Sequence, residues 1–403
     1  MICDQIARSG FYCIRKKWLF AMVADYYHYY YYALFVCIWW WLVCTPFLKG
    51  RTKKKNKKRK TRHCPEGPHI SPVAVAVMET GISSVCTMGT PECDDELYLF
   101  LRCLRVHHPD IPVIVGCTSA MLKVGENTKS KAYAGFCNDS RMVWIPCLDP
   151  YVPIQRREME RQPGVWYPSR HTDFMMEKAN LMEHAMMLRE EHGGDNTGAV
   201  LFLDCDVVLL NELPRIPSGT EVALSPHRIS PRDEALFGRY NGGFVAAASP
   251  APLHEWRRAT RHSRFFDQAS LESVAKKFVS TLYEIPPQHN YGYWRFFQSY
   301  RKNPLLEARQ FSMRRIGAQG EWILCYEGKP LGSIHTHFLD AINPRARDVS
   351  VFNGLMKKWI LKCIRPTPHA TTTALCSGAL AAVAAGNRRY KECFDLSILT
   401  ETR

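Results

Sequence analysis

Hydrophobic and polar positions alternate between two spacings along the chain. Short continuous apolar or β-branched runs predict buried strands, and apolar residues three or four positions apart predict amphipathic helices. The predicted strands are 73–78, 83–88, 112–117, 142–146, 200–203, 221–225, 243–248 and 331–338. The main predicted helices are 97–106, which Pro109 ends, and 172–189, which Thr172 caps. Strand, helix and strand in succession indicate an α/β fold with parallel strands.

Proline and glycine separate this α/β pattern from its flanks. A linker punctuated by these residues at 65–72 places the start of the folded domain near residue 73, and the pattern continues to about 345. The following segment, 346–403, includes an Ala-rich stretch at 374–386 that is too short to span a membrane. We therefore predict one α/β domain over 73–345 and a peripheral C-terminal segment.

The N-terminal part of the chain has a different pattern. Residues 26–48 form a run of 23 residues without a formal charge, rich in Tyr at one end and in Trp at the other. As a helix this run is long enough to cross the roughly 30 Å of a bilayer core, and aromatic residues are typical of both interfaces. We expect a transmembrane helix at 26–48 behind a tail at 1–25. A buried or interfacial aromatic helix is the alternative.

A polybasic linker, 49–72, follows the predicted transmembrane helix. Ten of the fourteen residues in 49–62 are Lys or Arg, which favours the cytosolic side for the body of the chain. Basic residues upstream, at 8 and 15–17, favour the opposite arrangement, which is the type II, lumenal one of Golgi and ER enzymes. We expect a single-pass membrane protein, with both orientations open.

Positive charge is concentrated in the same N-terminal part. The 403 residues have a formal net charge of +15, but residues 1–62 hold 14 Lys/Arg and 2 Asp/Glu. The rest of the chain then has 39 basic and 36 acidic side chains, and a body so nearly balanced argues against nucleic acid as a partner. The 16 cysteines contain no Cys-x-x-Cys pair, which argues against zinc ribbons and thioredoxin-like motifs.

Asp204 and Asp206 carry the first candidate chemistry, directly after the predicted strand 200–203. In an extended chain, residues i and i+2 point to the same side, so the two carboxylates converge. Carboxylates among apolar neighbours repel each other unless a cation joins them, and oxygen ligands suit Mn²⁺ or Mg²⁺. Solvated aspartates in a turn are the alternative, since a chain of this length contains about one Asp-x-Asp by chance.

Two histidines offer a further ligand. His335 and His337 lie at i and i+2 on the predicted strand 331–338, which places both imidazoles on one face. The same two aspartates and two histidines could instead hold a catalytic Zn²⁺ that activates water for hydrolysis. For either histidine alone, a satisfied place in the core is the simpler interpretation.

Two further clusters complete the candidate residues. Asn241 precedes the glycine pair Gly242–Gly243, where a ligand can approach the backbone closely. An ordinary turn is the alternative there. Asp267 and Gln268 follow two aromatic residues and, by themselves, predict a helix N-cap.

These clusters, in this order, resemble nucleotide-sugar glycosyltransferases of the GT-A fold, especially glycosyltransferase family eight. The family pattern has an opening strand, a lysine-bearing helix, an Asp-x-Asp strand, an Asn-Gly-Gly strand, an Asp-Gln pair, a Pro-x-x-Asn-Tyr-like segment and a terminal His-Phe-x-Gly. These stand here as Val85–Gly89, Lys178, Asp204–Asp206, Tyr240–Gly243, Asp267–Gln268, Pro287–Tyr291 and His337–Asp340. The resemblance covers about residues 80–340, and Asp340 departs from the family's glycine.

The resemblance implies a mixed, mostly parallel sheet flanked by helices and a hexosyltransferase that uses Mn²⁺ or Mg²⁺ and retains the anomeric configuration. It implies that the metal is bound by Asp204, Asp206 and His337, with His335 as the alternative. It further implies that the nucleotide sugar contacts Thr87, Gly89, Lys178, Asp204 and Gly243. The catalytic residues around the transferred sugar would be Asn241, Asp267 and Gln268.

Three hypotheses about function follow. The first is a membrane-anchored glycosyltransferase that moves a sugar from a nucleotide-diphosphate donor to a glycan, protein or lipid acceptor. The second is a metal-dependent hydrolase or phosphotransferase with the same Asp/His cluster, which would release its product without an acceptor. The third is an inactive scaffold that keeps the fold and binds no nucleotide sugar. The sequence names neither the donor sugar nor the acceptor.

Overall fold

The computed structural model describes residues 79–123, 130–191, 198–299, 303–317, 320–339, 346–365 and 387–400. All of them belong to one compact unit, Val75–Arg403. Four predicted segments lie outside the described residues, namely the tail 1–25, the transmembrane helix 26–48, the linker 49–72 and the strand 73–78.

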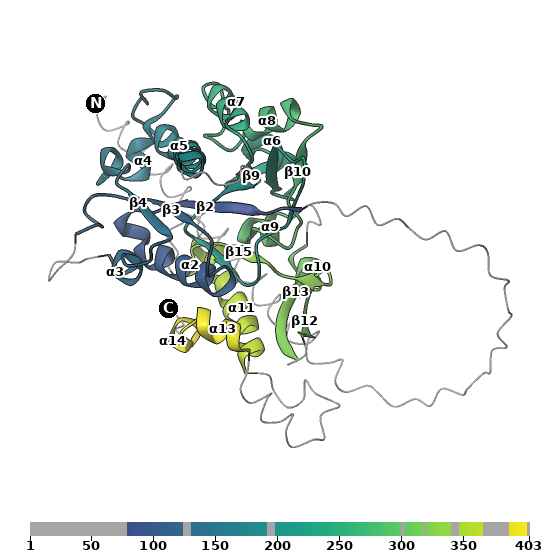
Figure 1. The fold of residues 1–403 in the computed structure, drawn as a ribbon. Coiled ribbons are helices and arrows are strands. Elements are labelled where there is room, and N and C mark those ends of the chain that lie inside the picture. The colour runs from purple at the N-terminus through teal and green to yellow at the C-terminus, as the bar shows by residue number, and fades with distance from the viewer. Residues whose placement is uncertain are drawn as a thin grey trace, which may run out of the picture. The chain divides into compact units, whose positions relative to one another are not determined.

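A seven-stranded sheet forms the centre of this unit (Figure 1), with the strand order β10-β8-β9-β5-β2-β3-β4. Every strand is parallel to its neighbours except β9, which is antiparallel to both β5 and β8. In the same order, their bounds are Leu282–Glu284, Val222–Pro226, Tyr240–Ala247, Ala199–Leu203, Ile82–Met88, Val113–Gly116 and Met142–Ile145. The predicted mixed, mostly parallel sheet is confirmed.

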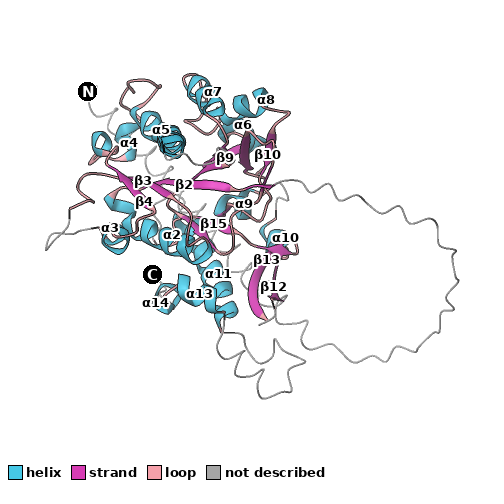
Figure 2. Cartoon of the chain, in the orientation of Figure 1, coloured by secondary structure: helices cyan, strands magenta, loops and turns pink. Residues whose placement is uncertain are grey.

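Helices cover both faces of this sheet (Figure 2). The period of two along each strand explains why. In β5, Leu201 and Leu203 pack into the cluster that contains the apolar side chains of α2, whereas Val200 and Phe202 pack into the cluster of α5. The longer helices are α2 (Asp94–His107), α5 (Arg170–Glu191), α7 (Pro250–Thr260) and α11 (Ala346–Ile364). The shorter ones are α3 (Lys131–Phe136), α4 (Arg156–Met159), α6 (Pro231–Phe237), α8 (Leu271–Lys277), α9 (Tyr293–Gln298), α10 (Pro304–Ala308), α13 (Arg388–Cys393) and α14 (Leu396–Thr400), with 3-10 turns η2 (Pro91–Cys93) and η3 (Asp149–Tyr151).

Three smaller sheets accompany the central one. The most relevant to function has the order β11-β15-β6, with bounds Tyr291–Gly292, Ser333–His335 and Val207–Leu209. The others are β12-β13-β14 (Phe311–Ile316, Glu321–Tyr326, Lys329–Pro330) and β1-β7 (Glu79–Thr80, Ile216–Pro217). Because β6 follows β5 directly in the chain, it joins the central sheet to the strand that carries His335.

Two helix starts differ from those predicted. Helix α5 begins at Arg170, and the Ser169 hydroxyl accepts the backbone N–H of Thr172 at 3.2 Å, so Ser169 takes the capping role expected of Thr172. Asp267 is not a helix N-cap, because α8 begins only at Leu271, after Ser270.

The C-terminal helices are part of the core, not peripheral as the sequence suggested. Phe352, Met356 and Ile360 recur every four residues along α11 and are fully buried. Tyr390 of α13 joins the same cluster. The described helices after residue 345 therefore pack on β13 and α2 and complete the core on that side.

No helix in the described part of the chain is long and apolar enough to cross a membrane. The longest, α5 and α11, both carry charged side chains along their length, such as Asp173 and Lys178 in the first and Lys358 in the second. This finding corrects the predicted localisation as a single-pass membrane protein, which depended on residues 26–48 outside the described part.

Candidate metal centre

A turn, not an extended strand, brings the two aspartates together. Strand β5 ends at Leu203, and the Asp204 carbonyl accepts the N–H of Val207 at 3.0 Å, which reverses the chain into β6. The Asp204 N–H donates to the Gly243 carbonyl of β9 at 3.0 Å. The predicted pair therefore lies at the carboxyl end of a central strand, but the turn geometry determines where its carboxylates point.

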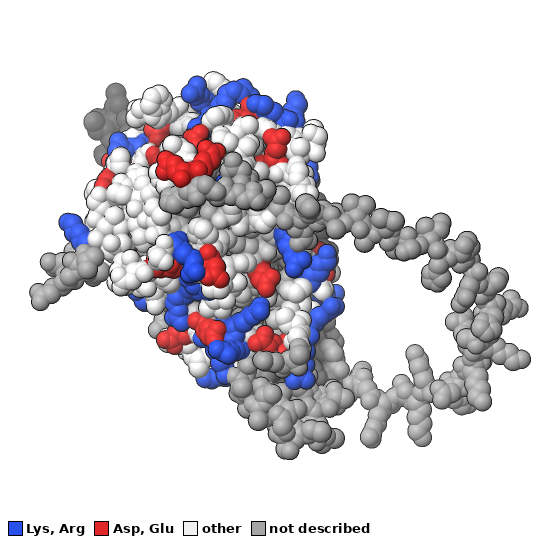
Figure 3. All heavy atoms as spheres, viewed as in Figure 1, with Lys and Arg blue, Asp and Glu red and all other residues white. Residues whose placement is uncertain are grey.

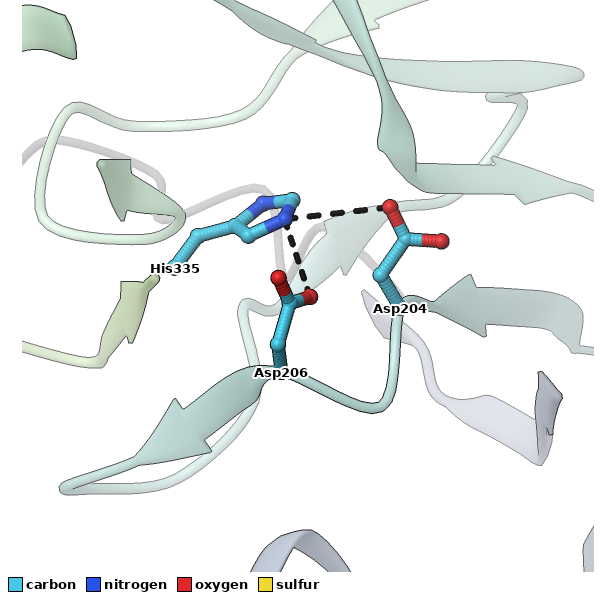
Figure 4. A group of neighbouring side chains, drawn as sticks. All are labelled: Asp204, Asp206 and His335. Carbon is cyan, nitrogen blue, oxygen red and sulfur yellow. Dashed lines mark ion pairs between the residues drawn. The ribbon is translucent and has the colours of Figure 1, made fainter. Parts of the chain in front are cut away.

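His335 completes a three-residue group with these carboxylates (Figure 4). Strand β15 pairs antiparallel with β6, and His335 lies opposite Val207, next to Asp206. Its Nε2 is 3.1 Å from Asp206 Oδ1 and 3.7 Å from Asp204 Oδ2. One candidate ligand atom from each of the three residues lies within 4.8 Å of the others. Oxygen and nitrogen atoms so arranged can hold a divalent cation.

His337 lies at the edge of this group. Its Nδ1 is 3.7 Å from Asp206 Oδ2 and is buried without a hydrogen-bond partner. The structure thus brings the alternative ligand, His335, into the centre and keeps His337 as the next nitrogen available to a cation.

Asn290 orients the imidazole of His335. Its Oδ1 lies 2.6 Å from His335 Nδ1, while its Nδ2 donates to Ser225 Oγ at 2.9 Å and to Asn241 Oδ1 at 3.2 Å. Because both amide donors are used, the Asn290 oxygen is the acceptor and His335 Nδ1 carries the proton. The lone pair of a neutral His335 then lies on Nε2, which faces the carboxylates. Sequence analysis assigned no role to Asn290, which only formed part of a resembling segment.

Charge at the centre is balanced within the protein. Burial works against ionisation of both His335 and Asp206, but each stabilises the charged form of the other. The net result raises the pKa of His335 and lowers the pKa of Asp206. A cation at Nε2 would compete with a proton for this nitrogen.

Lys178 lies beneath the aspartate pair and is fully buried. Its Nζ is 3.1 Å from Asp204 Oδ1, 3.5 Å from Asp267 Oδ2, and donates to the Gly242 carbonyl at 3.2 Å. Burial alone would lower the pKa of Lys178, but the two carboxylates outweigh it and raise that pKa. The lysine predicted to contact the donor therefore points at oxygen atoms of the protein. Its positive charge offsets the negative charge of Asp204 and Asp267.

The catalytic candidates gather around this lysine. Asp267 is 2% exposed, and burial raises its pKa, although Lys178 opposes the shift. Asn241 Nδ2 lies 3.5 Å from Gln268 Oε1, and Gln268 Nε2 donates to the Phe237 carbonyl at 2.8 Å. One carboxyl group and two amide groups thus lie side by side, and together they offer hydrogen-bond donors and acceptors.

The glycine pair makes room for these side chains. A Cβ on Gly243 would lie 2.6 Å from His335 Cε1 and would overlap the carboxylate of Asp204. A Cβ on Gly242 would overlap the carboxylate of Asp267. The sequence predicted that a ligand approaches the backbone closely at this glycine pair. In the structure, the side chains of Asp204, Asp267 and His335 make this close approach.

Thr87 and Gly89 lie at the carboxyl end of β2, the neighbour of β5. Cys86 of β2 pairs with Phe202 of β5, so the two parallel strands end at the same edge of the sheet. The Thr87 hydroxyl is buried and has no hydrogen-bond partner.

Comparisons with known proteins give matches in structure alone. No family model matches the chain, and no curated protein does. A galactosyltransferase, LgtC, solved with donor and acceptor sugar analogues, aligns with 13% identity and a TM-score of 0.38 over 68% of this chain and 95% of its own. The bifunctional glycosyltransferase WbbM aligns with 13% identity and a TM-score of 0.39, over 69% of this chain and 50% of its own.

A third similar structure is the glycosyltransferase GlyE of Streptococcus pneumoniae TIGR4, with 11% identity and a TM-score of 0.36 over 70% of this chain and 64% of its own. All three are glycosyltransferases, the class that the sequence resembles.

Proposed function

We propose that this chain transfers a hexose-type sugar from a nucleotide-diphosphate donor to a glycan, protein or lipid acceptor, with a divalent cation, Mn²⁺ or Mg²⁺. The observation that carries the proposal is the convergence of Asp204, Asp206 and His335 at the carboxyl edge of the central sheet. Ligands bind at this edge in open α/β sheets. A donor diphosphate is strongly negative, and a cation held there offsets its charge.

The residues present fit such a cation. Two carboxylates and an imidazole provide oxygen and nitrogen donors, which suit Mn²⁺ better than thiolates would. The buried, unpartnered Nδ1 of His337 adds one more nitrogen within reach. When bound, the cation would act as a Lewis acid and stabilise the negative charge of the departing nucleoside diphosphate.

The remaining roles belong to the chain's own residues. Lys178 holds Asp204 and Asp267 in place through their carboxylates. Asn241 and Gln268, 3.5 Å apart, present amide groups to the hydroxyls of the transferred sugar. Thr87 and Gly89 border the nucleotide on the neighbouring strand. We further propose that the transfer retains the anomeric configuration.

The test is a panel of nucleotide sugars incubated with the full chain and Mn²⁺, scored for release of nucleoside diphosphate with and without acceptor sugars. We expect release that requires the metal ion and increases with an acceptor. Asp206→Asn should reduce turnover by about 100-fold or more, because it removes a ligand of the charge-stabilising cation.

Asp110→Asn is the matched control, because the Asp110 carboxylate is 79% exposed and pairs only with surface Arg141 among its described ion pairs. It should leave turnover unchanged. Metal-independent turnover, or an Asp206→Asn variant as active as the control, would overturn the proposal. Release of phosphate without an acceptor would point to a hydrolase instead. Failure of every donor to bind would point to a scaffold.

A further inference from the structure

Two thiols meet directly beside the metal centre. Cys205 lies between Asp204 and Asp206 in the turn, and its Sγ is 3.5 Å from the Sγ of Cys93. The two cysteines are 112 positions apart, so the fold rather than the local sequence brings them together. Cys93 ends η2 and stands at the N-cap position of α2.

This pair differs from the other close cysteines in its accessibility. Both Cys93 and Cys205 are only partly buried. Cys103 and Cys393, which also contact each other, are both fully buried. Both thiol groups are enclosed by their surroundings, so a small disulfide reagent reaches them through local movement of η2 or of the turn, without unfolding of the core.

The geometry is close to that of a bond. Sulfur atoms in a disulfide are about 2.05 Å apart, so the two thiols have to approach by roughly 1.5 Å. The turn that contains Cys205 and the short η2 that contains Cys93 lie outside the central sheet strands. Side-chain rotation with a small shift of these two segments supplies that approach.

We propose that Cys93 and Cys205 are a modification site, at which a reversible disulfide weakens the binding of the metal ion. The oxidant is a low-molecular-weight disulfide, such as glutathione disulfide. One protein thiol displaces the first glutathione and forms a mixed disulfide, and the second protein thiol then displaces the other glutathione. Two protein thiols lose two protons and two electrons, and the reagent's sulfur–sulfur bond is reduced to two thiols.

The effect on the metal centre follows from the opposite directions of the side chains in the turn. Cys205 packs against the core cluster that contains α2, while Asp204 faces Gly243 and His335. A bond to Cys93 draws the turn toward α2 and away from His335. Metal–ligand distances tolerate only about 0.2 Å of change, so a small displacement of this kind weakens binding.

The experiment uses the full chain, equilibrated with glutathione disulfide or with dithiothreitol. Digestion without reduction, followed by mass spectrometry, should yield a peptide that links Cys93 to Cys205 only in the oxidised sample. The link should be absent in Cys93→Ser and Cys205→Ser. It should persist in Cys137→Ser, which removes another partly buried thiol.

Mn²⁺ binding, measured by calorimetry on the same samples, tests the consequence. We expect the oxidised protein to bind Mn²⁺ about tenfold more weakly, in the range of changes to groups that orient metal ligands. Dithiothreitol should restore the affinity, and the oxidant should not affect Cys93→Ser. A missing linked peptide, or equal affinities before and after oxidation, would overturn the inference.

The inference rests on the proposed function, and the two can fail separately. A reduced protein that binds Mn²⁺ but transfers no sugar contradicts the proposed function and leaves the thiol site standing. A reduced protein that transfers sugar but forms no link, or whose link leaves the Mn²⁺ affinity unchanged, contradicts the thiol site alone. A reduced protein that binds no Mn²⁺ contradicts both.

Discussion

At the scale of single residues, Asn290 sets the orientation of His335, the histidine of the proposed metal site. It is 1% exposed and has a φ of 54°, in the left-handed region that Asn and Gly tolerate best. Asn290→Gly therefore removes the amide without straining the backbone. Because His335 Nδ1 then loses its acceptor, we expect Mn²⁺ to bind about 10- to 100-fold more weakly in calorimetric titrations.

Asn290→Asp provides the control for that variant. A carboxylate keeps an acceptor for His335 Nδ1 and tolerates the same backbone conformation. It should recover a large part of the lost affinity. If the glycine variant binds Mn²⁺ as tightly as the wild type, Asn290 does not orient the ligand.

His227 provides a pH dependence of stability. Burial, reinforced by Arg295, lowers the pKa of His227 to about 4, and its ring is held by the Gly238 carbonyl and the Asn241 amide. In the unfolded chain its pKa is about 6.5, so between pH 6.5 and 4 the unfolded state binds a proton that the folded state does not. The free energy of unfolding therefore falls as the pH falls through this window, by up to about 3 kcal/mol from this group.

Urea unfolding at pH 7, 5.5 and 4.5 measures the effect. The pKa values of His171 and His289 are also lowered to about 4 by burial, so the wild type should lose stability more steeply than one proton explains. His227→Gln removes one titrating group and keeps hydrogen-bonding atoms. The stability of this variant should decline less between pH 7 and 4.5 than that of the wild type. An identical decline would show that His227 does not contribute to the pH dependence.

The choice between His335 and His337 marks the limit of sequence analysis at this scale. Alternation along a strand places both imidazoles on the same side, so periodicity cannot rank them. The pairing of β15 with β6 sets His335 opposite Val207, which brings its imidazole close to both carboxylates. That register depends on two segments more than 120 residues apart and has no local signature. By contrast, the resemblance predicted that Asp204, Lys178 and Asp267 belong to one site, and the Lys178 Nζ lies within 3.5 Å of both carboxylates.

At the scale of elements, α5 contributes a buried cation to the site. Lys178→Met removes the charge that lies between Asp204 and Asp267 and leaves two carboxylates close together in a buried setting. Removal of one partner from a buried ion pair typically costs about 3–5 kcal/mol. We expect a loss of this size in urea unfolding without metal. Added Mn²⁺ should reduce the loss, because a bound cation neutralises the same carboxylates.

Lys131→Met is the control for this variant. Lys131 pairs with Asp95 at 3.3 Å, but both side chains are more than half exposed, so its removal should cost less than about 1 kcal/mol. Equal losses for the two lysine variants would show that Lys178 is not an essential counter-charge.

The elements themselves were predicted with uneven accuracy. Strands β2, β3, β4 and β5 match the predicted runs closely. Strands β3 and β5 are buried continuous apolar segments, whereas β4 is an edge strand whose apolar run is only partly buried. Strand β15 is only Ser333–His335, although the apolar pattern extended over eight residues. The capping residues were less predictable, since Ser169 and Thr172 are equally good caps in sequence and the helix start depends on packing.

At the scale of the whole molecule, the distribution of charge agrees with the expectation from the sequence, whereas the hydrophobic pattern misled us about one segment. Basic and acidic side chains are interspersed on the face shown in Figure 3, in keeping with the nearly balanced body. The hydrophobic pattern was misleading at the C-terminus. We expected 346–403 to be peripheral, but β13, α9, α13 and α14 pack against α11 and cover its buried stripe.

The C-terminal helix α11 also forms hydrogen bonds to the segment that carries His335, so its contribution to the candidate metal site can be tested. Asn353 of α11 accepts a hydrogen bond from the Thr336 hydroxyl at 3.0 Å and donates to the His337 carbonyl at 2.5 Å, directly after the metal-site histidine. The helix thus fixes the end of β15. Any change that loosens α11 should disturb both the core and the position of His335.

Phe352→Ala tests this role of α11. The ring is fully buried and stacks on Tyr291 with the centroids 6.1 Å apart, so its removal should lower the free energy of unfolding by about 3–5 kcal/mol. Exposed Ser350 lies on the same helix, and Ser350→Ala should change stability by less than about 0.5 kcal/mol. Urea unfolding of the full chain measures both. A truly peripheral segment would unfold separately and leave Phe352→Ala within the range of the control, whereas a single cooperative transition shifted by the expected amount places residues 346–364 in the same folding unit as the metal centre.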